Sequence, residues 1–170
     1  MNSKNYATLF LNKLTELLGR NYHWQTQTIN GGMLMASANV PTVVGTREVG
    51  IFFNGEQVWA TLVLAGGAGL EYLSHEELLE LVYGMNNVTL TYGNLVSPIF
   101  ADDPNGNGIN VFLRSVVYGT SQNDPNFNND EECREMLLVT TAGLICDFIT
   151  FINNDVGTTV LEDFIHIFVD

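Results

Sequence analysis

The sequence predicts an α+β fold, with an antiparallel sheet and helices at the N-terminus, in the middle and near the C-terminus. Apolar residues have helical spacing near both ends of the chain, and β-rich runs occur in pairs around Asn-Gly turns. Helices interspersed with hairpins favour an α+β arrangement over a parallel sheet. We expect the order α-β-β-β-α-β-β-α in a single domain of residues 1–170, with residues 157–170 as a candidate extra C-terminal segment.

The opening segment, residues 4–19, predicts an amphipathic helix. Its apolar residues recur at intervals of three and four, and Gly19 is placed to end the helix. These residues are Tyr6, Leu9, Phe10, Leu14, Leu17 and Leu18. In the stretch that follows, Pro41 argues against a central strand at its position, because proline cannot donate a ladder hydrogen bond.

The segment "REVGIFFNGEQVWATLVLAG" predicts the first hairpin. Two β-rich runs flank Asn54-Gly55, and Asn-Gly supplies the positive φ angles that tight hairpin turns need. Side chains alternate between the two faces of a strand, so Phe52, Phe53 and Trp59 cannot all point the same way. Some of these aromatic side chains are therefore exposed unless both faces of the sheet are covered.

Ser74 opens the second predicted helix, "SHEELLELVYGMNN". Ser74 and Glu77 have the spacing of a capping box, in which each side chain bonds the backbone N–H of the other residue. The runs "VTLTYGNLVSPIFA" and "INVFLRSVVYGT" then predict a second hairpin.

The connection "DDPNGNGINVF" has the D-x-N-x-N-G spacing of a calcium loop, counted from Asp103. Such a loop needs a glutamate at its twelfth position, where this sequence has the cation Arg114. We therefore predict a hairpin turn and no metal, and leave a weak cation site as the open alternative.

Residues 130–153 predict the longest helix. Asn128 or Asn129 is placed to cap it, and three acidic residues begin it, where the helix dipole favours them. Its predicted buried stripe is Cys133, Leu137, Leu144, Phe148, Phe151 and Ile152. Thirteen helical residues separate Cys133 from Cys146, about 20 Å, so no disulfide joins them.

Charge is the most unusual global property, because 19 acidic residues face 6 basic ones for a net charge of −13. Such a chain is a poor partner for nucleic acid, since phosphate binding depends on lysine and arginine. Either solubility or attraction of a basic partner accounts for this charge. A membrane span needs about 18 apolar residues in a row. No such run and no convincing signal peptide occur, so we expect a cytoplasmic protein without membrane insertion.

Catalytic motifs are missing from the sequence. The three histidines His23, His75 and His166 are isolated, and "AGGAGLEYL" lacks the order of a phosphate-binding loop. We predict no catalytic residue, no metal and no cofactor, hence no enzyme. A small enzyme with a carboxylate-based site and a calcium-binding module remain alternatives from other classes.

Over residues 4–154 the chain resembles the type III secretion chaperone family, which includes class I effector chaperones and YbjN-like proteins. The likeness rests on element order and apolar pattern: "FLNKLTELLG", "VGIFFNGEQVWATLVLAG", "SHEELLELVYGMNN" running into "VTLTYGN", "NGINVFLRSVV" and "NNDEECREMLLVTTAGLICDFITFI". This resemblance implies a small acidic cytoplasmic homodimer without enzymatic activity.

The resemblance also implies that the protein holds an extended segment of a secreted effector in hydrophobic grooves. The protein-binding residues it implies are Leu14, Leu18, Phe52, Phe53 and Trp59, and the dimer-interface residues are Leu81, Val82 and Tyr92. The alternative within the same fold is a YbjN-like regulatory or stress-associated protein.

Overall fold

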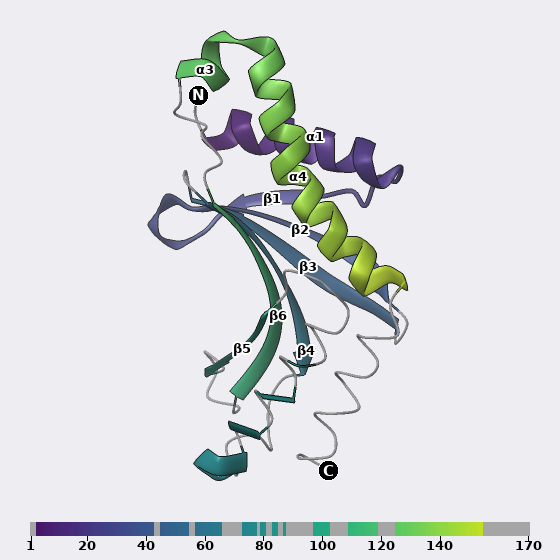
Figure 1. The fold of residues 1–170 in the computed structure, drawn as a ribbon, viewed down its shortest axis with the longest axis vertical. Coiled ribbons are helices and arrows are strands. Elements are labelled where there is room, and N and C mark those ends of the chain that lie inside the picture. The colour runs from purple at the N-terminus through teal and green to yellow at the C-terminus, as the bar shows by residue number, and fades with distance from the viewer. Residues whose placement is uncertain are drawn as a thin grey trace.

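The computed structural model describes residues 3–42, 45–54, 57–65, 73–77, 79–80, 83–84, 87, 97–102, 109–118 and 125–154. Its strands form an antiparallel six-stranded sheet in the order β1-β2-β3-β4-β6-β5, and helices α1 and α4 cross each other on one side of it (Figure 1). The elements are α1 (Ser3–Leu18), β1 (Gln25–Thr28), a 3-10 turn (Asn30–Gly32), β2 (Leu34–Thr42), β3 (Gly45–Phe53), β4 (Gln57–Ala65), β5 (Ser97–Asp102), β6 (Ile109–Tyr118), α3 (Pro125–Asn129) and α4 (Glu131–Asn154). The predicted α+β class with an antiparallel sheet is confirmed.

Both predicted hairpins are present. β3 and β4 pair from Phe53↔Val58, and Gln57 N–H donates to Asn54 Oδ1 at 3.0 Å in the turn between them. β5 and β6 pair from Asp102↔Ile109. The calcium-like residues 103–108 and the tail 157–170 lie outside the described residues.

Strand β1 was not predicted, because its sequence Gln-Thr-Gln-Thr is polar and all four residues are exposed. Within the described chain it pairs only with Leu34 to Ser37 of β2. Strand β2 continues to Thr42 through Pro41, which pairs with Thr46 of β3. At Pro41 the strand thus has one described neighbour, and the missing proline N–H faces an edge, where it costs no ladder bond.

An aromatic cluster joins the helices to the sheet. The Tyr6 ring centroid lies 6.2 Å from that of Phe53 on β3 and 5.6 Å from that of Phe127 on α3. Phe10 meets Phe53 edge to face, with 5.3 Å between centroids and 83° between planes. These four side chains are almost fully buried, so they form the centre of the core.

Helix α4 buries Phe148 and Ile152 as predicted, whereas the predicted Cys133, Leu137 and Leu144 are only half-buried and the side chain of Phe151 is not described. Its buried residues are Leu138, Thr141, Ala142, Ile145, Phe148, Ile149 and Ile152, and Leu137 and Leu144 flank this stripe. The Thr141 hydroxyl donates to Leu137 O at 2.7 Å, which satisfies the buried polar group. The helix cap is Asp130, whose Oδ1 accepts from Cys133 N–H at 3.0 Å, and not Asn128 or Asn129. Among the described helices, none is long and apolar enough to cross a bilayer.

The capping box of the second predicted helix is confirmed. Ser74 N–H donates to Glu77 Oε2 at 2.7 Å, and Glu77 N–H donates to Ser74 Oγ at 3.2 Å. These hydrogen bonds stabilise the charged carboxylate and hold the pKa of Glu77 below its ordinary value.

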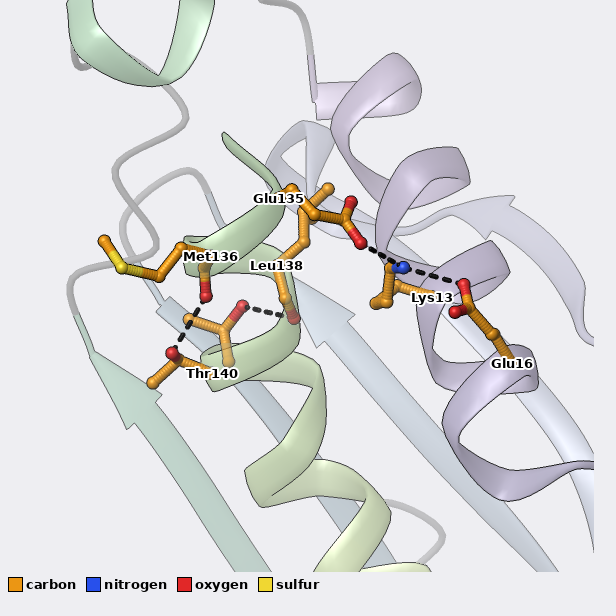
Figure 2. A network of polar contacts seen from close by, with 7 residues as sticks. Lys13, Glu16, Glu135, Met136, Leu138 and Thr140 are labelled. Atoms are coloured by element: carbon orange, nitrogen blue, oxygen red, sulfur yellow. Dashed lines mark hydrogen bonds and ion pairs between the residues drawn. The ribbon is translucent and has the colours of Figure 1, made fainter. Parts of the chain in front are cut away.

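Lys13 links α1 to α4, as Figure 2 shows. Its ammonium donates to Glu16 Oε2 at 2.7 Å on its own helix and to Glu135 Oε1 on α4. The lysine side chain is 11% exposed, so most of its aliphatic stem is covered by the two helices. The hydrogen bonds to Glu135 and Glu16 raise the pKa of the Lys13 ammonium above its ordinary 10.5.

We predict that Lys13→Met lowers the urea midpoint of unfolding at neutral pH. Methionine keeps most of the buried stem and removes the charge. Because the pKa of Lys13 is higher in the folded than in the unfolded chain, the stabilisation is complete below the ordinary pKa of 10.5 and is lost as pH rises through the folded pKa. The difference between variant and wild type should therefore be constant from about pH 6 to 9 and shrink above 10.5. Lys4→Met, at an exposed position of the same helix, is the control. A Lys13→Met deficit that persists undiminished above that pH would contradict the ion-pair assignment.

We also predict that Phe53→Ala is far more destabilising than Phe52→Ala. Phe53 is 2% exposed between the sheet and α1, so its removal should lower the free energy of unfolding by about 3–5 kcal/mol. Phe52 lies on the other face and is half-buried, and its removal should cost about 1–2 kcal/mol. Urea unfolding followed by circular dichroism measures both. Equal losses would show that the two faces of β3 are not distinct in burial.

Candidate protein-binding surface

The sheet has an inner face covered by α1 and α4 and an outer face on the opposite side. On β3, Val49, Ile51 and Phe53 are buried on the inner face, and the alternate residues between them are half-buried. On β4, Val58 and Ala60 are buried in the same way, with Trp59 between them half-buried. The outer face therefore contains side chains that the core does not use.

Phe52 and Trp59 form a stacked pair on the outer face. They are register partners on β3 and β4, and their rings lie 5.4 Å apart between centroids at an interplanar angle of 10°. A Cβ added to Gly50 would lie 3.0 Å from Phe52 Cε2, which shows that the Phe52 ring extends over Gly50. Met35, half-buried on β2, is the register partner of Phe52 and continues this apolar row. The absence of a side chain at Gly50 thus leaves room for the aromatic pair.

The five residues predicted to bind a protein segment lie on two sides of the sheet. Leu14 and Phe53 are buried in the core, at 0% and 2% exposure, and Leu18 packs against that core from α1. Phe52 and Trp59 are on the outer face and half-buried. The physical reason is strand alternation, which turns Phe52 and Phe53 in opposite directions. Phe52 and Trp59 are thus accessible from the outer face, Leu18 is partly accessible at the end of α1, and Leu14 and Phe53 are inaccessible in this structure.

A hollow beside the outer face was not anticipated from the sequence. It has a volume of about 240 Å³ and is lined by Tyr22, His23, Gln25, Ser37, Ala38, Asn39 and Glu48. It lies where β1 stops covering the edge of β2, since the last register pair is Gln25↔Ser37. The sequence gives no sign of where β1 ends, because β1 has no β-rich pattern. The end of β1 becomes visible only from its pairing with β2.

Local geometry at His23 turns the chain away from β2. His23 has a φ of 58°, in the left-handed region that residues other than glycine seldom adopt. Its N–H donates to Asn21 Oδ1 at 2.8 Å, so this N–H is taken locally and does not extend the β1–β2 ladder. The open edge of β2 follows from these two features.

Tyr22 forms a fixed wall of the hollow. It is 9% exposed, and its hydroxyl accepts a hydrogen bond of 2.7 Å from Asn153 Nδ2 at the end of α4. Its ring meets Trp24 edge to face, and the Arg20 guanidinium lies over the ring, 5.0 Å from the centroid. Contacts on several sides therefore hold this aromatic ring in place.

The predicted dimer residues Leu81, Val82 and Tyr92 lie outside the described residues. Two residues close to Leu81 and Val82 in the sequence are described, and both are large, apolar and exposed. Leu79 is 56% exposed and Tyr83 is 72% exposed, and both have helical backbone geometry. Side chains four residues apart on one helix lie on the same side of it.

Metal and nucleophile chemistry have little basis in the described part of the chain. Its histidine, cysteine, aspartate and glutamate side chains form no group of three or more that could hold a metal ion. Cys133 and Cys146 are free, as expected from their separation on one helix, and both are half-buried. Burial raises the pKa of the Cys146 thiol, which disfavours the reactive thiolate.

The accessible features with recognisable binding chemistry are therefore the aromatic pair Phe52–Trp59 and the hollow beside β2. Comparison of the chain with protein-family models and with curated proteins found no match to either.

Proposed function

We propose that this protein is a non-enzymatic chaperone that binds an extended segment of a protein partner on the outer face of its sheet. The observation that carries the proposal is the stacked Phe52–Trp59 pair, which is held in a fixed orientation yet remains partly exposed. Aromatic residues of this kind are common centres of binding energy in protein interfaces.

The surroundings of the pair suit an extended chain. Ser37, Gly50 and Thr61 form the next register row beside the aromatic row, so small side chains adjoin large ones. Residues on one face of a strand repeat about every 6.6 Å, the same spacing as alternate side chains of an extended peptide. A client can therefore place successive side chains against the aromatic row and the small-residue row. The fixed stacking lowers the entropy lost on binding.

Charge favours a basic or neutral client. The chain has a net charge of −13, and opposite charges on the two partners speed their encounter and exclude wrong partners. The resemblance to secretion chaperones suggests that the client is a secreted effector. A regulatory role in the manner of YbjN-like proteins would use the same surface for a different partner.

We predict that the variant combining Phe52→Ala and Trp59→Ala loses its client. The chain is co-expressed with the product of the adjacent gene, and the amount of that product that co-purifies is measured. Recovery should fall about tenfold or more, because aromatic anchors of interfaces commonly contribute about 2 kcal/mol or more.

Met136→Ala is the matched control for this experiment. Met136 is 63% exposed on α4, on the helical side of the sheet, so its removal tests whether any exposed apolar residue has the same effect. Circular dichroism establishes that each variant is folded. A folded double variant that retains the client in wild-type amounts would refute the outer-face proposal.

We further propose that the chain forms a homodimer through the helical segment that contains Leu79 and Tyr83. Large exposed apolar side chains at this spacing are typical of a helix that packs against a partner. Burying both side chains would remove apolar surface from water in each subunit.

Light scattering should accordingly give a mass of twice the 18.8 kDa chain. Leu79→Glu combined with Tyr83→Glu should shift the mass towards a single chain, because the variant places two carboxylates in an apolar contact. Met136→Glu, at an exposed apolar position of α4, should leave the mass unchanged. A strict monomer at all concentrations of the wild type would exclude the dimer.

A further inference from the structure

The open edge of β2 offers more acceptors than donors. Ile29 N–H donates to Met33 O at 2.8 Å, so by antiparallel alternation the odd-numbered residues of β2 direct their backbone groups towards β1. Ser37 pairs with Gln25, and no described strand continues the pairing beyond it. The next groups on this edge are the N–H and C=O of Asn39 and the C=O of Pro41. Because proline has no N–H, these groups comprise two carbonyl acceptors and one N–H donor.

The formal charge on the side chains that line the hollow is negative. Glu48 is the register partner of Asn39, and it is the formally charged residue among the described side chains that line the hollow. Gln25 and Asn39 add amide groups that can both donate and accept, and the Tyr22 ring forms an aromatic wall. The Glu48 carboxylate and the surplus edge carbonyl are best satisfied by a ligand with N–H donors and positive charge. The Arg20 guanidinium approaches the Tyr22 ring but is not part of the lining.

We propose that this hollow binds the guanidinium of an arginine in the client segment. The inference rests on the proposed function and adds a residue-specific contact to it. A guanidinium has five N–H donors in one plane and stacks on aromatic rings, whereas an ammonium is a compact point charge. The Arg20 guanidinium already lies over the Tyr22 ring at 5.0 Å, so the client guanidinium would bind mainly through Glu48 and the edge carbonyls.

Spacing on β3 defines which arginine of the client is bound. Glu48 and Phe52 are four residues apart on the outer face of the same strand, which corresponds to about 13 Å. An extended client covers this distance in about four residues. The client therefore has an apolar residue over the aromatic pair and an arginine about four positions away from it.

Titration with acetyl-arginine amide tests the site directly, and acetyl-citrulline amide is the matched probe because it replaces the charged guanidinium by a neutral urea. Backbone amide shifts are followed by NMR on the isotope-labelled full chain. Arginine amide should give saturable shifts at Gln25, Asn39 and Glu48, and citrulline amide should bind at least several-fold more weakly. Equal binding of the two probes, or no saturable shift at these residues, would overturn the proposal.

Glu48→Gln should weaken the binding of arginine amide about fivefold, as expected for a solvent-exposed ion pair. Glu131→Gln removes one negative charge at an exposed position of α4 and should leave the affinity unchanged, which separates a local contact from the general field of the chain. Similar weakening in both variants would count against a specific site.

The client assay separates this inference from the proposed function. If Glu48→Gln retains the client fully while the Phe52→Ala and Trp59→Ala double variant loses it, the arginine contact is wrong and the outer-face proposal stands. If the double variant retains the client, the outer-face proposal fails, and the client-arginine contact that depends on it fails with it. Reduced client recovery in Glu48→Gln, together with the arginine-selective shifts, supports both.

Discussion

The position of Phe53 in the core determines what the rest of the sheet can do. Its ring meets Phe10 at 5.3 Å between centroids, and Tyr6 packs against both, so α1 is fixed to the inner face of the sheet through aromatic contacts. Side chains alternate along a strand, and burial of Phe53 therefore places Phe52 on the outer face. A slip of one residue in β3 would exchange the two and expose Val49 and Ile51 as well. The accessible aromatic pair is thus a direct consequence of the packing that makes the core.

Local signals in the sequence predicted the strands around Asn-Gly and the capping box, because turn and cap chemistry acts over four residues or fewer. Apolar periodicity predicted the opening helix. Tertiary pairing decided the features that were missed. The polar segment of β1 is a strand because β2 offers it an edge, and a polar edge strand has no apolar alternation to detect. Residues 137 and 138 of α4 are both leucines, so the helical spacing of apolar residues does not by itself predict which of them is buried. Strand alternation already indicated that Phe52 and Phe53 lie on opposite faces, but only the packing of α1 decided which of the two is buried.

Two residues, one of them in the lining of the hollow, oppose regular pairing along the open edge of β2. His23 adopts a left-handed conformation and has its N–H bonded to Asn21, which ends the line of β1. Pro41 lacks the N–H that a further strand would use, and proline at an edge discourages pairing between molecules. This edge is open but poorly suited to pairing with a long added strand. It therefore favours contacts with the side chains of a ligand. Binding at this edge is therefore expected through the side chains of the hollow and not through a backbone ladder.

The few basic residues of the chain reinforce this conclusion. Of six in total, Lys13 is held between two glutamates, Arg134 donates to the carbonyls of Phe127 and Asn128, and Arg20 lies over Tyr22. These cations are engaged within the molecule, where they fix α1, α3 and the start of β1. Nineteen acidic residues greatly outnumber them, and Glu48 is one that lines the hollow beside β2. Since cation binding requires a local arrangement of acceptors as well as a favourable field, the proposed client would be attracted by the general acidity of the chain, and the hollow would select one residue of it.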